Sequence, residues 1–342
     1  MIDRPTFVLE KDKLKKNIKI LRDLASKSGA KFLYTLKGFD KKKGLKYISL
    51  DGFSISNLSE FKKISKDTHI HSYSLAFKDI KAISKISTTL SFNSLTQYKS
   101  LADKSSKYTS IGLRINPQIK LKQYKSCDTS RKKNRFGVNY KEFIKRYNRN
   151  EFPNLEGLHF HIFCYQDTNS LNLLINHIDK NYKHILKNLK WINLGGGQNF
   201  THKDYDRDKF IQIIQQFKTK HPHIEIIFEP SSAVLKDIGY FKTTIVDIID
   251  DIAILNTSIE THLLDIAITK YKPKISNTTK KKTPHKYTLS GMSCIANDTI
   301  GTYYFKQKLH IGDTIIIKDM LAYTLVKQTT FNGIIGARFD TI

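Results

Sequence analysis

The sequence predicts an α/β fold in which a TIM barrel of eight parallel β-strands and their helices is followed by a smaller antiparallel β domain. Two patterns support this prediction. Short apolar runs alternate with polar stretches long enough to form a helix, which is typical of parallel βα units. After Lys236 the apolar runs follow one another without such stretches, which indicates antiparallel strands. A chain of 342 residues with 39% apolar content is long enough for one large domain and a smaller one.

The barrel elements come after a leading strand, which we expect over residues 6–10. A helix is predicted over residues 13–25, where Leu14, Ile18 and Leu21 are spaced to form one apolar face. The predicted barrel strands then cover residues 31–36, 52–56, 68–73, 88–92, 110–115, 155–163, 190–194 and 225–228. These eight strands, most of them followed by a helix-length stretch, give the number of βα units in a TIM barrel.

The second domain is predicted from shorter strands without helices between them. These strands cover residues 246–249, 252–255, 287–290, 303–305, 314–317 and 328–332. We expect residues 11–236 to form the barrel, and residues 1–10 with 237–342 to form the β domain, because the leading strand has no place in the barrel. We expect no further strand after Gly333.

The charge of the chain is strongly basic, with a net charge of +27 from 58 Lys and Arg against 31 Asp and Glu. Such a charge can indicate a nucleic-acid or membrane partner. However, the lysines are spread over the whole chain, and the densest runs, at 41–43, 131–133 and 280–282, contain no interleaved aromatic residues that could stack on bases. We therefore expect neither nucleic acid nor membrane as a partner.

The compartment is predicted from the cysteines and from the amino terminus. Cys127, Cys164 and Cys294 are too few and too scattered for a disulfide framework or a zinc site, which fits a reducing environment. Residues 1–5 show no apolar core of a signal peptide, and no apolar run approaches the ~20 residues of a membrane span. We expect a cytoplasmic protein.

Lys37 is the first candidate for chemistry, because the active site of a TIM barrel lies at the carboxyl ends of its strands. It follows the apolar strand Phe32-Leu33-Tyr34-Thr35-Leu36 and precedes Gly38. Desolvation at such a position lowers the pKa of an amine, and a neutral amine can attack an aldehyde to form a Schiff base. The alternative is a lysine that reaches from the strand end into solvent. The predicted strand ends also carry Asn57, Asn93, Arg114, His161, Gly195–Gly197 and Glu229.

Three of these strand ends suit a flat, phosphorylated cofactor. Gly195, Gly196 and Gly197 leave their backbone N–H groups unobstructed for a phosphate, or they form only a tight turn. His159 and His161 face the same way in one strand; a zinc pair is conceivable, but no third ligand is evident, and a histidine could instead stack on a cofactor ring. Glu229 is either a solvated loop residue or a partner for a protonated pyridine nitrogen.

These motifs recur in order in one enzyme family. The sequence carries Lys37 in Leu-Lys-Gly-Phe, Leu158-His159-Phe160-His161, Gly195–Gly197, Glu229-Pro230, Ser293-Cys294-Ile295-Ala296-Asn297-Asp298, Asp319–Thr324 and Thr330-Phe331-Asn332-Gly333. In this combination it resembles the alanine-racemase-like (fold type III) decarboxylases that depend on pyridoxal 5'-phosphate (PLP). Within the group, residues 5–10, 156–164, 190–197, 257–265 and 324–333 most resemble carboxynorspermidine decarboxylase.

The resemblance implies a role for each matching residue. Lys37 would form the internal aldimine with PLP, His161 would stack on the ring, and Glu229 would pair with the ring nitrogen. Arg114 would support the cofactor, and Gly195–Gly197 with Tyr323 would hold its phosphate. In a homodimer with shared active sites, Cys294 of the partner subunit would donate a proton. The polyamine end of the substrate would meet Glu260, Asp265 and Asp298.

The implied reaction is decarboxylation of carboxynorspermidine or carboxyspermidine to norspermidine or spermidine, without a metal. Two alternatives stay open: a related decarboxylase of another amino acid such as diaminopimelate, and a PLP-binding pseudoenzyme. Against diaminopimelate, residues 290–302 hold no arginine-rich motif for a second carboxylate. The positions that differ from the usual family pattern are Tyr165, Gln198, Ser231, Ser232, Asn256 and Asn297.

Overall fold

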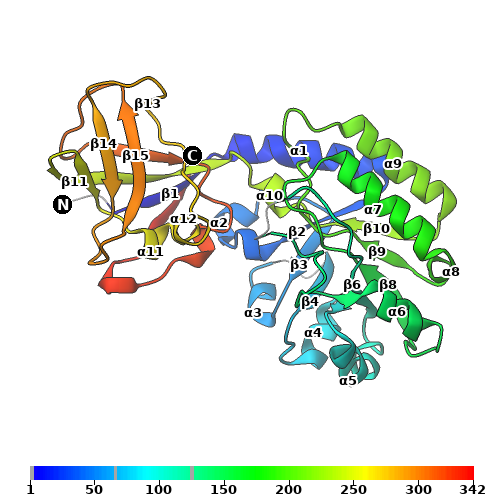
Figure 1. The fold of residues 1–342 in the computed structure, drawn as a ribbon. Helices are drawn as coiled ribbons and strands as arrows, with labels where there is room; N and C mark the ends of the chain where they lie inside the picture. The colour runs from blue at the N-terminus through cyan, green and yellow to red at the C-terminus, as the bar shows by residue number, and fades with distance from the viewer. Residues whose placement is uncertain (1–3, 65–67, 124–126) are drawn as a thin grey trace. The chain divides into compact units, whose positions relative to one another are not determined.

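The computed structural model describes residues 4–64, 68–123 and 127–342 and divides into two compact units (Figure 1). One unit comprises Lys16–Val234, and the other comprises Met1–Lys15 with Leu235–Ile342. Residues 1–3, part of the stretch in which we expected no signal peptide, lie outside the described residues. Within the described ranges, no helix combines the length and the apolar character that a membrane crossing requires.

The unit Lys16–Val234 contains a closed barrel of parallel strands, which confirms the predicted fold class. Neighbouring strands pair in the order β5-β4-β3-β2-β10-β9-β8-β6, and a β5–β6 pairing closes the ring. The barrel strands are β2 (Lys31–Thr35), β3 (Gly52–Ile55), β4 (His69–Ser74), β5 (Thr89–Phe92), β6 (Ser110–Asn116), β8 (Leu155–His159), β9 (Trp191–Asn193) and β10 (Glu225–Phe228). A short ninth strand, β7 (Val138–Asn139), extends the sheet from β6.

Helices and turns of very different length connect these strands. The longer helices are α1 (Lys11–Ser28), α4 (Ile80–Ile86), α5 (Leu95–Ser105), α6 (Tyr140–Tyr147), α7 (Thr168–Asn181) and α9 (Arg207–Lys220). The short ones are η1 (Leu36–Gly38), α2 (Lys42–Leu45), α3 (Leu58–Phe61), α8 (Lys183–Leu186) and α10 (Ser231–Val234). Side-chain caps start α7 and α9: Asp167 accepts hydrogen bonds from two backbone amides of α7, and Asp206 accepts one from α9.

The interior of the barrel contains an apolar layer and a polar layer. Leu33, Trp191 and Ile227 form one buried cluster. Gly157 makes room for the indole, because a Cβ built there would lie 2.0 Å from Trp191. Since alternate residues of a strand face the same side, the next inward positions toward the carboxyl ends are Thr35, Asn193 and Glu229. The polar layer therefore lies where the active site of a TIM barrel is expected.

The second unit is a sheet with the strand order β13-β15-β14-β12-β11-β1-β17, and β16 pairs with β11. Its strands are β1 (Thr6–Leu9), β11 (Gly239–Ile249), β12 (Ile252–Leu255), β13 (Thr278–Thr279), β14 (Lys286–Ser290), β15 (Thr299–Phe305), β16 (Thr314–Lys318) and β17 (Arg338–Thr341). Most pairings are antiparallel, as predicted, but β1–β17 and β12–β14 are parallel. Two short helices, α11 (Ile259–His262) and α12 (Leu264–Thr269), follow β12.

Several strand predictions are wrong. The strands predicted over 246–249 and 303–305 begin earlier, at Gly239 (β11) and Thr299 (β15). Residues 328–332 form no strand: the short turns η2 (Leu325–Lys327) and η3 (Phe331–Gly333) occupy this region, and Asn332 adopts a left-handed φ of 58°. A strand does follow Gly333, because β17 pairs with β1. The strand predicted over 155–163 ends at His159. Beyond it the carbonyl of His161 accepts hydrogen bonds from Arg114 and Thr129 side chains instead of a neighbouring strand.

Candidate active site

Glu229 is the centre of the polar layer. It follows β10 and is only 5% exposed, so it is not a solvated loop residue. Its Oε1 accepts a hydrogen bond from Asn193 Nδ2 at 2.8 Å, and its Oε2 accepts one from Thr35 Oγ1 at 3.2 Å. The Nε2 atoms of His71 and His159 each lie 3.9 Å from Oε1. Four strands therefore direct polar side chains at one carboxylate.

The charge of Glu229 is maintained although the residue is buried. Burial raises the pKa of the carboxyl, but the interactions with His71, His161 and Lys37 and the hydrogen bond from Asn193 outweigh it, so the pKa lies below its ordinary value. Glu229 is therefore ionised near neutral pH. A buried carboxylate is the partner that a protonated pyridine nitrogen requires.

His161 presents a neutral imidazole beside the glycine turn. Its Nδ1 accepts a hydrogen bond from the Gly196 N–H at 3.1 Å, which places the ring proton on Nε2. Burial, with the charges of Lys37 and Arg114, lowers the pKa of His161 to about 3. A Cβ at Gly195 would lie 2.3 Å from His161 Nδ1, so a larger residue there would displace the ring.

The glycine turn has little space around it, and two of its three N–H groups already have hydrogen-bond acceptors. A Cβ at Gly196 would lie 2.4 Å from the Glu229 carbonyl oxygen, and one at Gly197 would lie 2.1 Å from the Phe163 carbonyl oxygen. We expected three unobstructed N–H groups. Instead, the Gly195 N–H donates to Asn193 Oδ1 at 2.8 Å and the Gly196 N–H donates to His161. Among the described residues, only the Gly197 N–H of the three has no hydrogen-bond acceptor.

Lys37 lies in η1, directly after β2, and its side chain is exposed. The expectation that the strand end would desolvate this amine is therefore wrong for the unliganded chain, because the lysine leaves the apolar strand through the turn. Its charge nevertheless acts on the site, since it lowers the pKa of both Glu229 and His161. Lys37 thus lies within electrostatic reach of both residues.

Arg114 is buried in β6 and supports the site from within. Its Nη1 donates to Tyr73 Oη at 2.6 Å, and its Nη2 donates to the His161 carbonyl at 2.9 Å. The guanidinium carbon lies 5.0 Å from the Tyr73 ring centre and 4.6 Å from that of Phe136. Arg114 therefore holds the backbone of His161 in place.

The other strand-end candidates have structural partners. Asn57 caps α3, and Asn93 Oδ1 accepts hydrogen bonds from Tyr73 Oη and the Gly137 N–H. Neither ring nitrogen of buried His159 has a hydrogen-bond partner among the described residues. In the described part of the chain, no group of three His, Cys, Asp or Glu side chains could hold a metal ion.

Sequence reasoning missed His71, Thr35, Tyr73 and Asn193. For two of them the signal was strand periodicity: Asn193 stands two residues after Trp191, and Thr35 stands two after Leu33, so each points inward. Several positions that differ from the family pattern are also structural. Ser231 donates to the Thr35 carbonyl at 3.2 Å, and Asn256 Oδ1 accepts hydrogen bonds from β11.

The remaining candidates lie in the second unit, on three segments that contact one another. The Cys294 N–H donates to Asn332 Oδ1 at 2.8 Å. The Ile259 N–H donates to Asp298 Oδ1 at 2.8 Å, and Thr329 Oγ1 donates to the Glu260 carbonyl at 2.8 Å. These bonds bring Cys294, Asp298, Glu260, Asp265 and Tyr323 into one set of loops, which we call the loop cluster (residues 257–265, 291–298 and 323–335).

The acids of the loop cluster already have partners in their own chain. Asp298 is 3% exposed, and its second oxygen accepts a hydrogen bond from the Ser293 N–H at 3.1 Å. Asp265 forms an ion pair with Lys327 and accepts a hydrogen bond from Thr324. Glu260 Oε2 accepts a hydrogen bond from Ser258 at 2.9 Å. The ammonium of Lys327 lies 5.5 Å from the ring centre of Tyr323, and the Cys294 residue is exposed.

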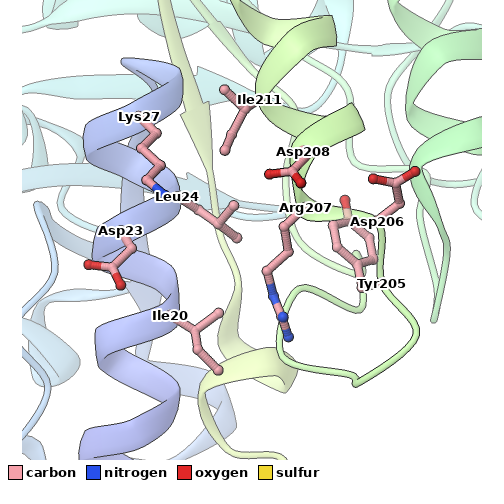
Figure 2. Close-up of a pocket in the computed structure, with 9 residues that line it drawn as sticks. All are labelled: Ile20, Asp23, Leu24, Lys27, Tyr205, Asp206, Arg207, Asp208 and Ile211. Carbon is pink, nitrogen blue, oxygen red and sulfur yellow. The ribbon is translucent and has the colours of Figure 1, made fainter.

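A groove of about 460 Å³ on the outside of the barrel is a separate feature (Figure 2). Asp23 and Lys27 of α1 face Arg207 and Asp208 of α9 across it. Arg207 donates hydrogen bonds to two backbone carbonyls, so it is already engaged. None of the predicted site residues lines this groove.

Comparison with known proteins connects both units to one family. The model of the pyridoxal-binding domain of pyridoxal-dependent decarboxylases matches residues 30–236, and the model of their C-terminal sheet domain matches residues 163–320. A carboxynorspermidine/carboxyspermidine decarboxylase from Campylobacter jejuni is 36% identical over 97% of this chain and 91% of its own length. A carboxyaminopropylagmatine decarboxylase from Synechocystis is 32% identical over 96% and 87%.

A solved structure is similar as well. It is the carboxynorspermidine decarboxylase of Campylobacter jejuni complexed with norspermidine, which is 34% identical to this chain. The match covers 99% of this chain and 95% of that one, with a TM-score of 0.88.

Proposed function

The chain belongs to the pyridoxal-dependent decarboxylase family, and we propose that it decarboxylates carboxynorspermidine or carboxyspermidine in polyamine biosynthesis. The full-length similarity to the decarboxylase from Campylobacter jejuni carries the substrate proposal, and the norspermidine complex of its similar structure supports it. We further propose residues 11–236 as the cofactor-binding domain and residues 1–10 with 237–342 as the sheet domain.

The residues of the barrel fit PLP. Bound PLP supplies an electron sink for the pair left by the departing carboxylate. Glu229 is ionised and accepts only one hydrogen bond at Oε2, so it suits the ring nitrogen. Lys37 would bind the aldehyde, and the neutral ring of His161 would cover one face. The phosphate would meet the Gly195–Gly197 turn, chiefly through the Gly197 N–H, together with Tyr323.

The proposed roles of the loop cluster concern substrate and proton transfer. Cys294 would donate a proton to the reacting carbon, and we propose that it comes from the partner subunit of a homodimer. Glu260 and Asp265 would receive the cationic arm of the substrate, which would have to compete with Lys327 for Asp265. Asp298 would position the loop that carries Cys294, because both of its oxygens already accept backbone hydrogen bonds. Arg114 would act through His161.

We place the reaction in the cytoplasm. None of Cys127, Cys164 and Cys294 forms a disulfide in the described part of the chain, which suits a reducing compartment.

Carboxyaminopropylagmatine is a second candidate substrate, because a relative that is 32% identical over nearly the whole chain is a decarboxylase of that compound. It shares the carboxylated aminopropyl group with carboxynorspermidine and differs at the far end. The two candidate substrates would therefore make the same contacts at the cofactor site and different contacts with the loop cluster.

The test is release of CO₂ by the PLP-loaded protein from carboxynorspermidine, carboxyspermidine, carboxyaminopropylagmatine and diaminopimelate. We expect the first two to give the highest kcat/KM. A higher value for carboxyaminopropylagmatine would establish the second candidate. No release from any of the four compounds, with borohydride still fixing the cofactor to the Lys37 peptide, would indicate a pseudoenzyme.

A further inference from the structure

The side chains of β4 and β10 meet across the inside of the barrel. Strands β3 and β2 separate them in the sheet, so any contact between them passes through the interior. His71 of β4 lies 3.9 Å from Glu229 at the carboxyl end, and His69 Nδ1 lies 3.8 Å from Glu225 Oε1 at the opposite end. The interior therefore holds a glutamate at each end, with two histidines between them.

One threonine connects the two histidines. His69 Nε2 lies 3.0 Å from Thr89 Oγ1, and Thr89 Oγ1 lies 2.9 Å from His71 Nδ1. At the far side of the ring, His71 Nε2 lies 3.3 Å from Ser91 Oγ and 3.9 Å from Glu229 Oε1. Hydrogen-bond contacts thus connect His69 to His71, and His71 Nε2, which also contacts Ser91, lies near Glu229 Oε1 but beyond hydrogen-bond distance.

Both imidazoles are neutral, as such a chain requires. Burial, with the charges of His71 and Lys31, lowers the pKa of His69 to about 3, and burial lowers the pKa of His71. A neutral imidazole donates at one nitrogen and accepts at the other, and a hydroxyl donates once. At His71 two arrangements are therefore possible: Nδ1 accepts from Thr89 and Nε2–H points toward Glu229, or Nδ1–H donates to Thr89 and Nε2 carries a lone pair.

The difference between the two glutamates decides the orientation. Glu225 has a side chain that is 32% exposed, and it is paired with Lys31. Glu229 is 5% exposed, and the field of a buried charge is screened much less. In the opposite orientation, a lone pair of His71 Nε2 would face the buried carboxylate. Donors that point toward Glu229 are therefore favoured.

We propose that His69, Thr89 and His71 form a polarised hydrogen-bond chain whose last donor, His71 Nε2–H, is directed at Glu229 Oε1. This chain helps to keep Glu229 ionised and leaves Oε2 for the ring nitrogen of the cofactor; the second part rests on the proposed function. The three residues position a binding group and do not touch the substrate.

Oε1 and Oε2 of Glu229 have unequal surroundings, which supports the proposal. Asn193, His71 and His159 all approach Oε1, whereas among the described residues Thr35 is the one hydrogen-bond donor to Oε2. Charged or titratable groups that act on Glu229 or its neighbours come from several elements: Lys37, His71, Arg114, His159 and His161. Substitutions at Thr89 leave all of these groups in place, so they test the contribution of the hydrogen-bond chain separately.

Thr89→Val removes the linking hydroxyl and keeps the shape of the side chain. Thr89→Ser keeps the hydroxyl. Thr88→Val is the matched control, because Thr88 is exposed on the neighbouring position and its hydroxyl serves only the Ile70 amide. In the apoprotein, NMR of ¹⁵N-labelled histidine should show His71 protonated at Nε2 in the wild type, Thr89→Ser and Thr88→Val. Thr89→Val should keep this tautomer, because Glu229 favours it, but His71 Nδ1 should lose the chemical-shift signature of a nitrogen that accepts a hydrogen bond.

The second measurement is PLP binding as a function of pH. In Thr89→Val, the loss of binding on the acid side should move to higher pH by about 0.5–1 unit, as expected for one hydrogen bond. Thr89→Ser and Thr88→Val should follow the wild type. A His71 protonated at Nδ1 in the wild type, or an unchanged binding profile in Thr89→Val, would overturn the proposal. Failure of the wild type to bind PLP would instead refute the proposed function. The His71 tautomer in the apoprotein would still test the proposed hydrogen-bond chain.

Discussion

The barrel interior and the loop cluster carry their polar residues in different ways. Around Glu229, side chains from several strands converge on one buried carboxylate. In the loop cluster, Asp265 and Asp298 have partners within a few segments of their own chain, and Cys294 is exposed. Strands hold groups in fixed geometry, whereas loops can change without loss of the fold. This difference supports our proposal that the barrel binds the cofactor and that the loops recognise the substrate.

The largest effect is expected from Lys37→Ala, because no other amine can replace the proposed covalent link to the cofactor. We expect kcat to fall at least ~10³-fold. Mass spectrometry after borohydride treatment should find no labelled peptide. A label on another lysine would show that this other residue, and not Lys37, binds the cofactor.

Glu229→Gln should have the next largest effect. The amide keeps the shape but not the charge, so the ring nitrogen loses its ionic partner. We expect kcat to fall by about 10²–10³-fold, the range for removal of one preorganised electrostatic contact, with weaker PLP binding and an altered absorption spectrum. Unchanged kcat and spectrum would show that Glu229 only serves the packing of the barrel.

Cys294→Ala tests the loop cluster. Unlike Glu229→Gln, it should change kcat without changing PLP binding. Loss of a proton donor should lower kcat by about 10²-fold or more, while PLP affinity stays the same. Turnover assays and cofactor titration on the same preparation make this comparison. If kcat and PLP affinity fell together, Cys294 would be structural. The loop cluster would then also contribute to cofactor binding.

Acid should destabilise the barrel more than the sheet unit. Burial lowers the pKa of His69, His71, His159 and His161. The unfolded chain binds protons near pH 6.5, whereas native His69 and His161 do not bind theirs until about pH 3. Stability therefore falls as pH falls through this window, by up to ~1.4 kcal/mol per pH unit for each of these two histidines, and the lowered pKa values of His71 and His159 act in the same direction.

Trp191, the one tryptophan of the chain, lies in the barrel interior and can report this loss by fluorescence. Thermal unfolding followed at Trp191 between pH 7 and pH 4 should show a falling midpoint. A midpoint that does not change with pH would contradict the assignment of these histidines as neutral and buried.

Asp265→Asn should have the smallest effect. It removes a partly exposed ion pair with Lys327, and such pairs contribute ~1 kcal/mol or less. We expect a decrease of a few degrees in the melting temperature and a higher KM for a cationic substrate, without a change in PLP binding. An unchanged KM would remove Asp265 from the substrate site.

The sequence was sufficient to predict the barrel because periodicity is a local property, and all eight strands occur near their predicted positions. Two kinds of feature escaped it. The partners of Glu229 come from distant strands, so His71 could be found only once the ring of strands was known. Strand ends depend on tertiary contacts: Asn332 accepts the Cys294 amide in a left-handed turn, where alternating residues had predicted a strand.

The pairing of β17 with β1 has a consequence for the behaviour of the protein in concentrated solution. β1 carries Phe7, Val8 and Leu9, all buried, and lies between β11 and β17. The outer strand β17 is only four residues long and alternates charged Arg338 and Asp340 with its other residues, features that discourage edge-to-edge association. Proteolytic trimming of these last residues would expose an apolar edge, so a trimmed preparation should aggregate while its barrel remains folded.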